Sequence, residues 1–521
     1  MGDETIRTTV AAGYTFEGAA LELGGLMLGA DELSDVPIRI PLAMLNRHGL
    51  VAGATGTGKT KTLQLMAEQL STAGVPVFAA DVKGDLSGLS TFGEGGDKIT
   101  ARAASVGQTW KATAFPVEYY ALGGDGTGIP LRVTMSAFGP ILLSKVLGLN
   151  ETQESSLGLI FHYADTAGLA LLDLADLREV VKYLVSDDGK AELKDLGGLS
   201  AATAGVILRE LIAFSDAGAD AFFGEPEFET RDFLRMTPSG KGLISLIELP
   251  TLAERPLVFS TFLMWLLADL FHDLPEVGDV DKPKLVFFFD EAHLLFNDAS
   301  KAFLDSIAQT VRLIRSKGVG IFFVTQSPTD VPDDVLAQLG SRIQHQLRAH
   351  TPNDAKALKA TVNTYPTSGY DDLGAVLTSL GIGEAVVTVM NERGAPTPVA
   401  WTRLRAPESL MGPAEASAMT ATVQSSALYS KYAVAVDRES AREQLGAKLT
   451  AGADKAAAEA QAAPAPSTPK APKQPKTPSP RARRSQDKGV VEKVVTSTAF
   501  RQVLRTAARE IVRGAFGTGR R

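Results

Sequence analysis

Cysteine is missing from the 521 residues of this sequence, which excludes disulfide bonds and metal sites built on thiolates. Its absence is compatible with a reducing compartment. The N-terminus has no apolar signal region, and the most apolar long stretch, residues 257–268, is too short to cross a bilayer. We therefore expect no transmembrane segment and a location in the cytoplasm. Apolar residues make up 45% of the chain and charged residues 21%, as in soluble globular proteins.

Positive charge is scarce in most of the chain. The net charge is −8, yet residues 461–521 hold 14 Lys and Arg against 3 Asp and Glu, a net +11. Residues 1–460 must therefore carry −19. An acidic body with a basic tail is typical of chains whose tail meets nucleic acid or another anionic surface.

Apolar periodicity divides the chain into segments. Residues 1–46 alternate short apolar runs with Gly and Pro, which predicts a small β-rich module. Residues 47–134 and 236–405 alternate apolar strands with helices, which predicts an α/β core with a parallel sheet. The unbroken apolar run Leu285–Phe289 is typical of a sheet covered on both faces. Residues 135–235 show helical spacing instead and predict a mostly helical insertion within the core.

The C-terminal part of the sequence loses the pattern of the core. We expect a helical extension over 406–450 and a disordered linker over 451–489, which is rich in Ala, Pro, Lys and Ser. Residues 490–521 predict a basic amphipathic helix, with arginines at positions 501, 505, 509 and 513. Four interpretations stay open for it: binding to DNA phosphates, lying on a membrane surface, docking on a protein partner or on the ring, and an ordinary solvated face.

One glycine-rich loop carries the most specific chemistry. Gly53-Ala-Thr-Gly-Thr-Gly-Lys-Thr60 matches G-x-x-x-x-G-K-[ST] and lies between an apolar strand and a helix, a context that argues against a chance turn. Backbone N–H groups of such a loop surround phosphates, the lysine reaches the β- and γ-phosphates, and the hydroxyl after it binds Mg²⁺. The predicted nucleotide-binding residues are Gly53, Ala54, Thr55, Gly56, Thr57, Gly58, Lys59, Thr60 and the adjacent Lys61.

Two acids follow the apolar strand Leu285–Phe289. Asp290 at the strand end is predicted to hold Mg²⁺, together with Thr60. Glu291 is predicted to accept a proton from the attacking water. A glutamate here favours hydrolysis over transfer to a bound acceptor, which weakens the hypothesis of a small-molecule kinase.

A third strand, Gly320–Thr325, ends in Gln326, which we expect to orient the water or sense the phosphate. The alternative for Gln326 is an ordinary turn before Pro328. Arg312 and Arg315 lie on one face of the preceding helix and are candidates for an arginine finger that reaches a neighbouring subunit. By spacing alone, a solvated helix face is the better explanation of the two arginines.

Four runs of the sequence resemble bacterial HerA-like helicase proteins, a branch of the FtsK–HerA superfamily of P-loop ATPases. They are residues 46–60, 81–86, 289–296 and 315–328, within a similarity over about residues 10–445. The resemblance implies a RecA-like fold, ATP and Mg²⁺ as cofactors, and a hexameric ring that moves or remodels duplex DNA.

The resemblance also implies roles for single residues. Arg47, just before the glycine-rich loop, corresponds to an arginine that contacts nucleotide. Arg315 corresponds best to an arginine that acts across the subunit interface, and Arg342 is a weaker candidate. Asp81 corresponds to an acid of the nucleotide site that follows the second strand.

The leading hypothesis is an ATP-hydrolysing, DNA-directed motor that assembles as a homohexamer. The alternative is a nucleotide-gated switch or scaffold that acts on a protein partner. The acidic body favours the alternative, because a DNA channel needs basic loops and the core has no obvious ones.

Overall fold

The computed structural model describes residues 2–450, apart from 124–125, 194–195, 250–255, 297–300, 367 and 449. The predicted linker (451–489) and basic helix (490–521) lie outside these residues. The chain divides into two compact units. The larger comprises Met1–Phe138, Lys145–Gly148 and Ala213–Val436, and the smaller comprises Gly139–Ser144, Leu149–Ile212 and the described residues after 436. Among all described helices, none has the length and apolarity needed to cross a membrane.

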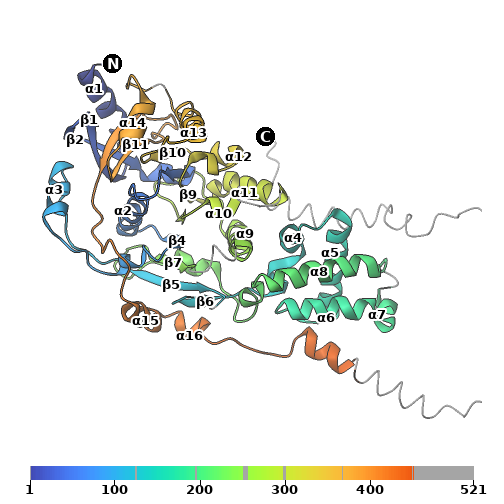
Figure 1. The fold of residues 1–521 in the computed structure, drawn as a ribbon. Coiled ribbons are helices and arrows are strands. Elements are labelled where there is room, and N and C mark those ends of the chain that lie inside the picture. Colours follow the sequence, from blue (N-terminus) through green and yellow to red (C-terminus); the bar gives the residue numbers. More distant parts are fainter. Residues whose placement is uncertain are drawn as a thin grey trace, which may run out of the picture. The chain divides into compact units, whose positions relative to one another are not determined.

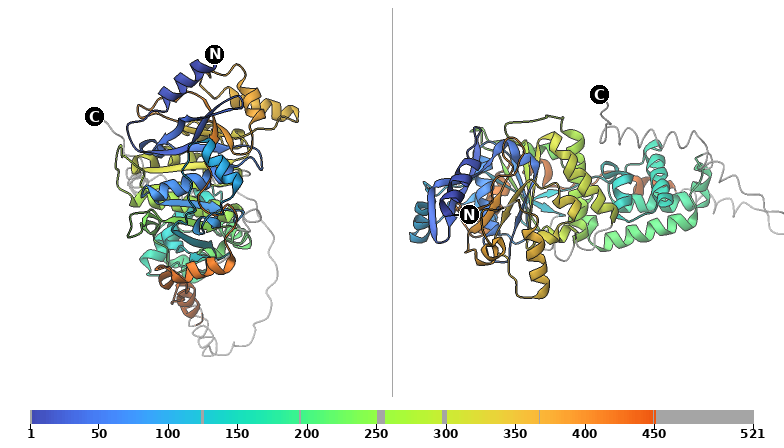
Figure 2. Two further views of the ribbon diagram at one scale, coloured as in Figure 1. Left: turned by 90° about the vertical axis from the view of Figure 1, so that its left-hand side faces the viewer. Right: turned by 90° about the horizontal axis from the view of Figure 1, so that it is seen from above.

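A twelve-stranded sheet forms the centre of the larger unit, in the order β2-β1-β12-β11-β10-β3-β9-β8-β4-β7-β5-β6 (Figures 1 and 2). The strands are β1 Ala20–Leu28, β2 Asp31–Pro41, β3 Gly49–Ala52, β4 Val77–Asp81, β5 Val117–Leu122, β6 Ile129–Leu131, β7 Ile244–Glu248, β8 Leu285–Phe289, β9 Val319–Thr325, β10 Ser341–Gln344, β11 Glu384–Thr388 and β12 Ala400–Leu404. From β10 to β6 all neighbours are parallel. From β2 to β10 they are antiparallel. The predicted α/β fold with a largely parallel sheet is confirmed.

Helices cover both faces of this sheet. The connection from β3 to β4 runs along the sheet in one direction, and the connections from β7 to β8 and from β8 to β9 run in the other. Because such connections are right-handed, α2 (Lys59–Thr72) lies on one face of the sheet, and α9 (Pro256–Asp273) and α11 (Lys301–Ile314) lie on the other (Figure 1). The whole of β8 is 0% exposed. Each of its phenylalanines contributes about 1.5–3 kcal/mol by burial.

The remaining helices are short or lie outside the sheet's central layer. They are α1 Asp3–Gly13, α3 Asp97–Ser105, α4 Met135–Val146, α5 Glu151–Thr166, α6 Leu174–Val185, α7 Asp187–Glu192, α8 Ala201–Asp216, α10 His293–Phe296, α12 Asp333–Leu336, α13 Pro352–Val362, α14 Leu373–Ser379, α15 Ala416–Ser425 and α16 Tyr429–Tyr432.

The β-rich segment expected over residues 1–46 is part of the main sheet. Strands β1 and β2 continue it, because β1 pairs with β12. The segment also begins with helix α1, which the sequence analysis did not predict and which buries Ile6 and Val10. Just after α1, the hydroxyl of Tyr14 lies within hydrogen-bond distance of the carbonyl oxygens of Val387 in β11 (2.9 Å) and Pro398 (3.0 Å), which ties this segment to β11 and to the loop before β12.

The smaller unit is helical and contains α5, α6, α7 and the first part of α8. Asn150 and Asp173 begin α5 and α6 with capping boxes, so both helix starts are specified locally. Asp176 of α6 accepts hydrogen bonds from the hydroxyl of Ser440 (2.5 Å) and the backbone N–H of Arg442 (3.0 Å). The described residues after 436 therefore belong to this unit, while α15 and α16 belong to the larger one.

Only part of the segment 135–235 lies in the smaller unit, since residues from Ala213 belong to the larger one. The physical reason is aromatic packing. Phe222 lies 5.8 Å from Phe262 of α9, and Phe233 lies 5.1 Å from Phe78 of β4, measured between ring centroids.

Candidate functional site

Four neighbouring parallel strands end at one edge of the sheet, in the order β3, β9, β8 and β4. Polar or glycine-rich residues occur at each of these ends: the loop from Gly53 after β3, Gln326 after β9, Asp290 and Glu291 after β8, and Asp81 at the end of β4. Ligands of open α/β sheets bind outside the carboxyl ends of the strands. The strand order therefore brings these predicted residues to one edge.

The loop between β3 and α2 requires glycine at three positions. Gly53, Gly56 and Gly58 have φ angles of 155°, 83° and 112°, which other residues rarely adopt. At Gly53 a Cβ atom would lie 2.5 Å from Cβ of His345, so a side chain has no room. Neighbouring segments hold the loop in place, because Gln346 O accepts from the N–H of Ala54 (2.8 Å) and Thr57 O accepts from the N–H of Gly383 (3.0 Å).

Lys59 is the first residue of α2 and points back into the loop. Its ammonium donates hydrogen bonds to the carbonyl oxygens of Gly53 (2.7 Å) and Ala54 (3.2 Å), and the residue is only 8% exposed. Burial lowers the pKa of Lys59, and the carboxylates of Glu291 and Asp290 partly oppose this effect. With the loop's N–H groups and the start of α2, this cation makes a binding site for polyphosphate.

Asp290 and Thr60 offer the oxygen ligands that Mg²⁺ prefers. Asp290 is 6% exposed, and one of its oxygens accepts the N–H of Glu291 at 2.9 Å. Burial and the neighbouring Glu291 charge raise the pKa of Asp290 to about 6. Thr60 lies half-buried in the first turn of α2. Among the described residues, no three His, Cys, Asp or Glu side chains gather where they could hold a metal ion. Mg²⁺ commonly takes oxygens from substrate phosphates and water beside one or two carboxylates.

Glu291 has an unusual backbone conformation. Its φ is +47°, a left-handed conformation that costs a non-glycine residue on the order of 1 kcal/mol or more and is typical of functional sites. The following N–H, of Ala292, is held by the carbonyl of Val324 at 2.8 Å, which fixes the turn against β9. Glu291 is 7% exposed although it lies at the edge of the sheet. Its geometry is that of a fixed carboxylate.

Lys83 is a site residue that the sequence analysis did not single out. Its ammonium forms an ion pair with Oε1 of Glu291. Burial alone would raise the pKa of Glu291, but the pairing with Lys83 outweighs it, so the pKa is lowered. Lys83 lies in the run 81–86, one of the four that carry the family resemblance, but only the aspartate of that run was assigned a role.

Asp81 and Lys61 are directed to the protein's own backbone. The carboxylate of Asp81 accepts the N–H groups of Gly84 and Leu86, each at 2.8 Å, and burial raises its pKa to about 6. It shapes the loop that carries Lys83. The ammonium of Lys61 donates to the carbonyl of Met411 at 2.6 Å, away from the phosphate-binding loop. The nucleotide contacts of both residues stay predictions.

Gln326 is exposed beyond the end of β9, on the same edge as the loop. Arg47 and Arg315 lie on the other edge, because Arg47 stands two residues before the start of β3 and Arg315 four residues before the start of β9. The length of β3, about 13 Å for four residues, separates Arg47 from the loop of its own subunit. The contact of Arg47 with a nucleotide stays a prediction.

The two further arginine candidates, Arg312 and Arg342, do not lie beside the phosphate-binding loop. Arg312 is exposed on α11. Arg342 on β10 donates to the carbonyl of Thr364 at 3.2 Å, and its guanidinium lies 6.0 Å from the ring centroid of Tyr365.

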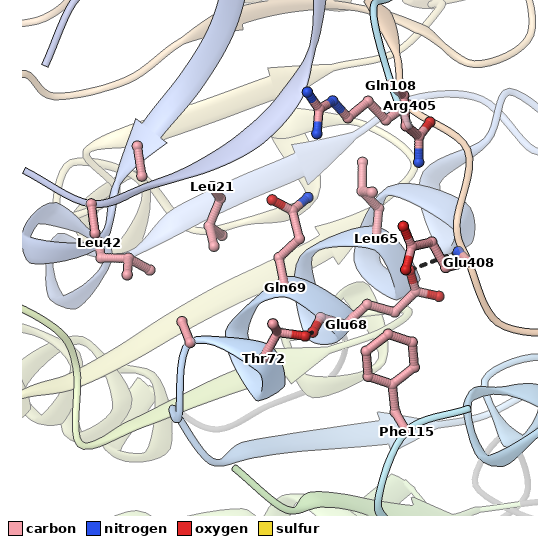
Figure 3. A pocket seen from close by; sticks show the side chains of 13 residues that line it. Leu21, Leu42, Leu65, Glu68, Gln69, Thr72, Gln108, Phe115, Arg405 and Glu408 are labelled. Atoms are coloured by element: carbon pink, nitrogen blue, oxygen red, sulfur yellow. Dashed lines mark hydrogen bonds between the residues drawn. The ribbon is translucent and has the colours of Figure 1, made fainter. Parts of the chain in front are cut away.

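The second half of α2 contacts the segment that follows β12. Glu68 is 2% exposed and accepts the N–H groups of Glu408 (2.9 Å) and Ser409 (3.0 Å). Burial raises the pKa of Glu68 to about 7, although these hydrogen bonds lower it. Beside Glu68 lies a cavity of about 350 Å³ whose lining includes Phe115 and Arg405 (Figure 3). The hydrogen bonds of Glu68 therefore hold α2 against the segment that follows β12.

Comparison with known proteins gives a consistent assignment. Residues 27–521 match the family model described as helicase HerA-like C-terminal. The DNA double-strand break repair helicase HerA of Sulfolobus acidocaldarius is 23% identical over 372 residues, which cover 70% of this chain and 66% of that protein. The protein of the same name from Sulfurisphaera tokodaii is 23% identical over 370 residues, again 70% and 66%. The match thus spans just under two thirds of each relative.

The fold is similar to that of the bacterial conjugative coupling protein TrwB in its unbound form. The TM-score is 0.52 at 17% identity, over 79% of this chain and 94% of the other. At this identity the similarity concerns the fold, and it agrees with the predicted P-loop core.

Proposed function

The chain belongs to the helicase HerA-like C-terminal family, and from that membership we propose that it hydrolyses ATP with Mg²⁺ and uses the energy to move or remodel DNA as a ring oligomer. The observation that carries the proposal is the arrangement at the carboxyl edge of the sheet. There the phosphate-binding loop with Lys59 lies on the same edge as Asp290 and Glu291.

Hydrolysis follows from the positions of these side chains. The loop N–H groups and Lys59 bind the β- and γ-phosphates, while Thr60 and Asp290 would hold Mg²⁺, which when bound would offset phosphate charge. A water oxygen attacks the γ-phosphorus and the bond to the β-phosphate oxygen breaks, giving ADP and phosphate. Glu291 takes the proton that the water loses. Gln326, exposed on the same edge, orients that water or senses the γ-phosphate.

Sharing of the site between subunits is supported by the position of the arginines. Arg47 and Arg315 lie together at the amino edge, opposite the edge that holds the phosphate-binding loop of their own subunit. In a closed ring a heterologous interface places this edge against another subunit's site. We assign Arg315 as the residue that acts on the neighbour's nucleotide, with Arg47 beside it, and a hexamer as the assembly.

Action on DNA is supported by the curated relatives, which are named DNA double-strand break repair helicases. The basic residues of the tail, 14 Lys and Arg within 461–521, supply charge for phosphate contacts. The alternative is a nucleotide-gated switch that acts on a protein partner, with the predicted C-terminal helix as a docking element. The net charge of −19 on residues 1–460 favours this alternative. A cytoplasmic location stays a prediction.

One experiment distinguishes the two functions. The ATPase rate is measured with and without duplex DNA, on full-length protein whose mass in solution has been determined. A motor should be a ring oligomer whose rate DNA raises severalfold, and Lys59→Ala should abolish the stimulated rate. An ATPase rate that DNA leaves unchanged would favour the switch. Absence of ATP hydrolysis would reject both the motor and the switch, because both depend on turnover.

A further inference from the structure

Lys83 reaches Glu291 from a different strand end, 208 residues away in the sequence. The two oxygens of the Glu291 carboxylate are not equivalent. Oε1 is paired with the ammonium of Lys83. Oε2 is buried and has no hydrogen-bond partner in the described part of the chain, although Nδ1 of His293 lies 3.3 Å from it. Oε1 is thus held by an ion pair, whereas Oε2 accepts no hydrogen bond within the described part of the chain.

Hydrogen bonds within the loop also fix the backbone that carries Lys83. Asp81 accepts the N–H groups of Gly84 and Leu86, and the hydroxyl of Ser87 donates to the carbonyl of Gly84 at 2.7 Å. Gly84 has a φ of +75°, which lets the chain turn back after Lys83. The backbone around Lys83 is therefore held by three hydrogen bonds, so Asp81 indirectly determines where the ammonium lies.

The ion pair with Lys83 affects the Glu291 carboxylate in two ways. A glutamate side chain has three rotatable bonds, and a carboxylate that rotates presents its lone pairs to the water for only part of the time. The surroundings of Glu291 are mostly protein, since the residue is 7% exposed, and a buried charge without a partner is costly. An ammonium on one oxygen removes both problems without occupying the other oxygen.

We propose that Lys83 is a positioning residue for Glu291, whose ion pair on Oε1 fixes the carboxylate and leaves Oε2 to accept the proton of the attacking water. The inference rests on the proposed ATP hydrolysis. The competing role, a second lysine that binds phosphate, is less well supported, because the ammonium contacts a carboxylate directly. Lys59, in the glycine-rich loop, already supplies the phosphate cation.

The two roles give different kinetics, which full-length Lys83→Met and Lys83→Arg separate. A positioning lysine acts on the chemical step, so Lys83→Met should lower kcat about 10- to 100-fold, a part of the 10²–10⁴-fold that a general base supplies. KM and the affinity for a fluorescent ATP analogue should change less than about twofold. Lys83→Arg should recover most of the rate, because it keeps the ion pair. In a Glu291→Gln background, Lys83→Met should change the residual single-turnover rate less than about twofold.

Lys182→Met is the matched control, since Lys182 also pairs with a glutamate, Glu179, and is 58% exposed in its side chain. It should leave kcat and KM unchanged. If Lys83→Met unfolds, as thermal melting would reveal, Lys83→Gln is interpreted by the same criteria.

Two results overturn the inference alone: wild-type kcat in Lys83→Met, or a loss of nucleotide affinity of tenfold or more with kcat unchanged, which would make Lys83 a phosphate ligand. A wild-type protein that binds the analogue but does not hydrolyse ATP would reject the proposed function, and the inference with it.

Discussion

Arg47 and Arg315 lie close enough together that the charge of Arg315 adds to burial in lowering the pKa of Arg47. Both residues stand shortly before the start of parallel strands, β3 and β9, that are neighbours in the sheet. Two cations are therefore gathered at the edge opposite the phosphate-binding loop. Like charges in one place are unfavourable, and Asp279 of the same chain opposes only part of this effect on Arg47. The nucleotide of an adjacent subunit would be a further anion.

Replacement of Arg315 tests this arrangement. Arg315→Ala should bind ATP and assemble normally but hydrolyse it poorly, since arginine fingers contribute on the order of a thousandfold or more in rate. Steady-state ATPase assays and mass measurement check this. Mixing Arg315→Ala with Glu291→Gln subunits should restore activity at interfaces that keep one intact Glu291 and one intact Arg315. Normal activity in Arg315→Ala would transfer the role to Arg312 or Arg342.

Substitutions at the carboxyl edge of the sheet should separate ATP binding from ATP hydrolysis. Lys59→Ala removes the phosphate cation, so nucleotide affinity and turnover should both be lost. Glu291→Gln keeps the loop and the metal ligands, so it should bind ATP with wild-type affinity while kcat falls at least a hundredfold. Equilibrium titration and ATPase assays give the two quantities. Near wild-type hydrolysis by Glu291→Gln would contradict its assignment as the base.

Glu68 should make the stability of the protein depend on pH. Burial raises its pKa from 4.5 to about 7 in the folded state, so between these values the folded chain holds a proton that the unfolded chain has lost. The stabilisation is complete below pH 4.5 and is lost as the pH rises to 7, with a slope of at most about 1.4 kcal/mol per pH unit.

Urea unfolding of wild type and Glu68→Gln from pH 5 to pH 8 measures this effect. Wild type should lose stability relative to the variant up to pH 7, and the difference should then stay constant. Glu94→Gln, at an exposed position, is the control and should follow wild type throughout. A difference between wild type and Glu68→Gln that does not change with pH would show that Glu68 keeps its charge on folding.

Deletion of residues 451–521 tests the role of the basic tail. ATP hydrolysis should persist, since the composition of 451–489 argues against packing on the core. DNA affinity should become less sensitive to salt, because fewer lysines and arginines release counterions. Binding titrations from 50 to 300 mM salt give the slope. An unchanged slope would remove DNA from the tail's partners and favour docking on a protein.

The sequence by itself determined those features that depend on residues adjacent in the chain. The glycine-rich loop, Lys59 at the start of its helix, and Asp290 and Glu291 after an apolar strand are all local patterns. Their chemistry requires set residue types at set spacing, and a buried parallel strand requires an unbroken apolar run. For the same reason the predicted parallel α/β core is confirmed, and the helices of 135–235 were expected close to where they lie.

The tertiary structure alone decided which distant residues meet. Periodicity reports the face of a strand or helix, but not which strand becomes its neighbour. The pairing of β1 with β12, the contact of Lys61 with Met411, and the ion pair of Lys83 with Glu291 each join segments far apart in the chain. Arg47 is the clearest case. It stands six residues before Gly53, yet the strand between them carries it to the opposite edge of the sheet, because an extended chain separates its two ends.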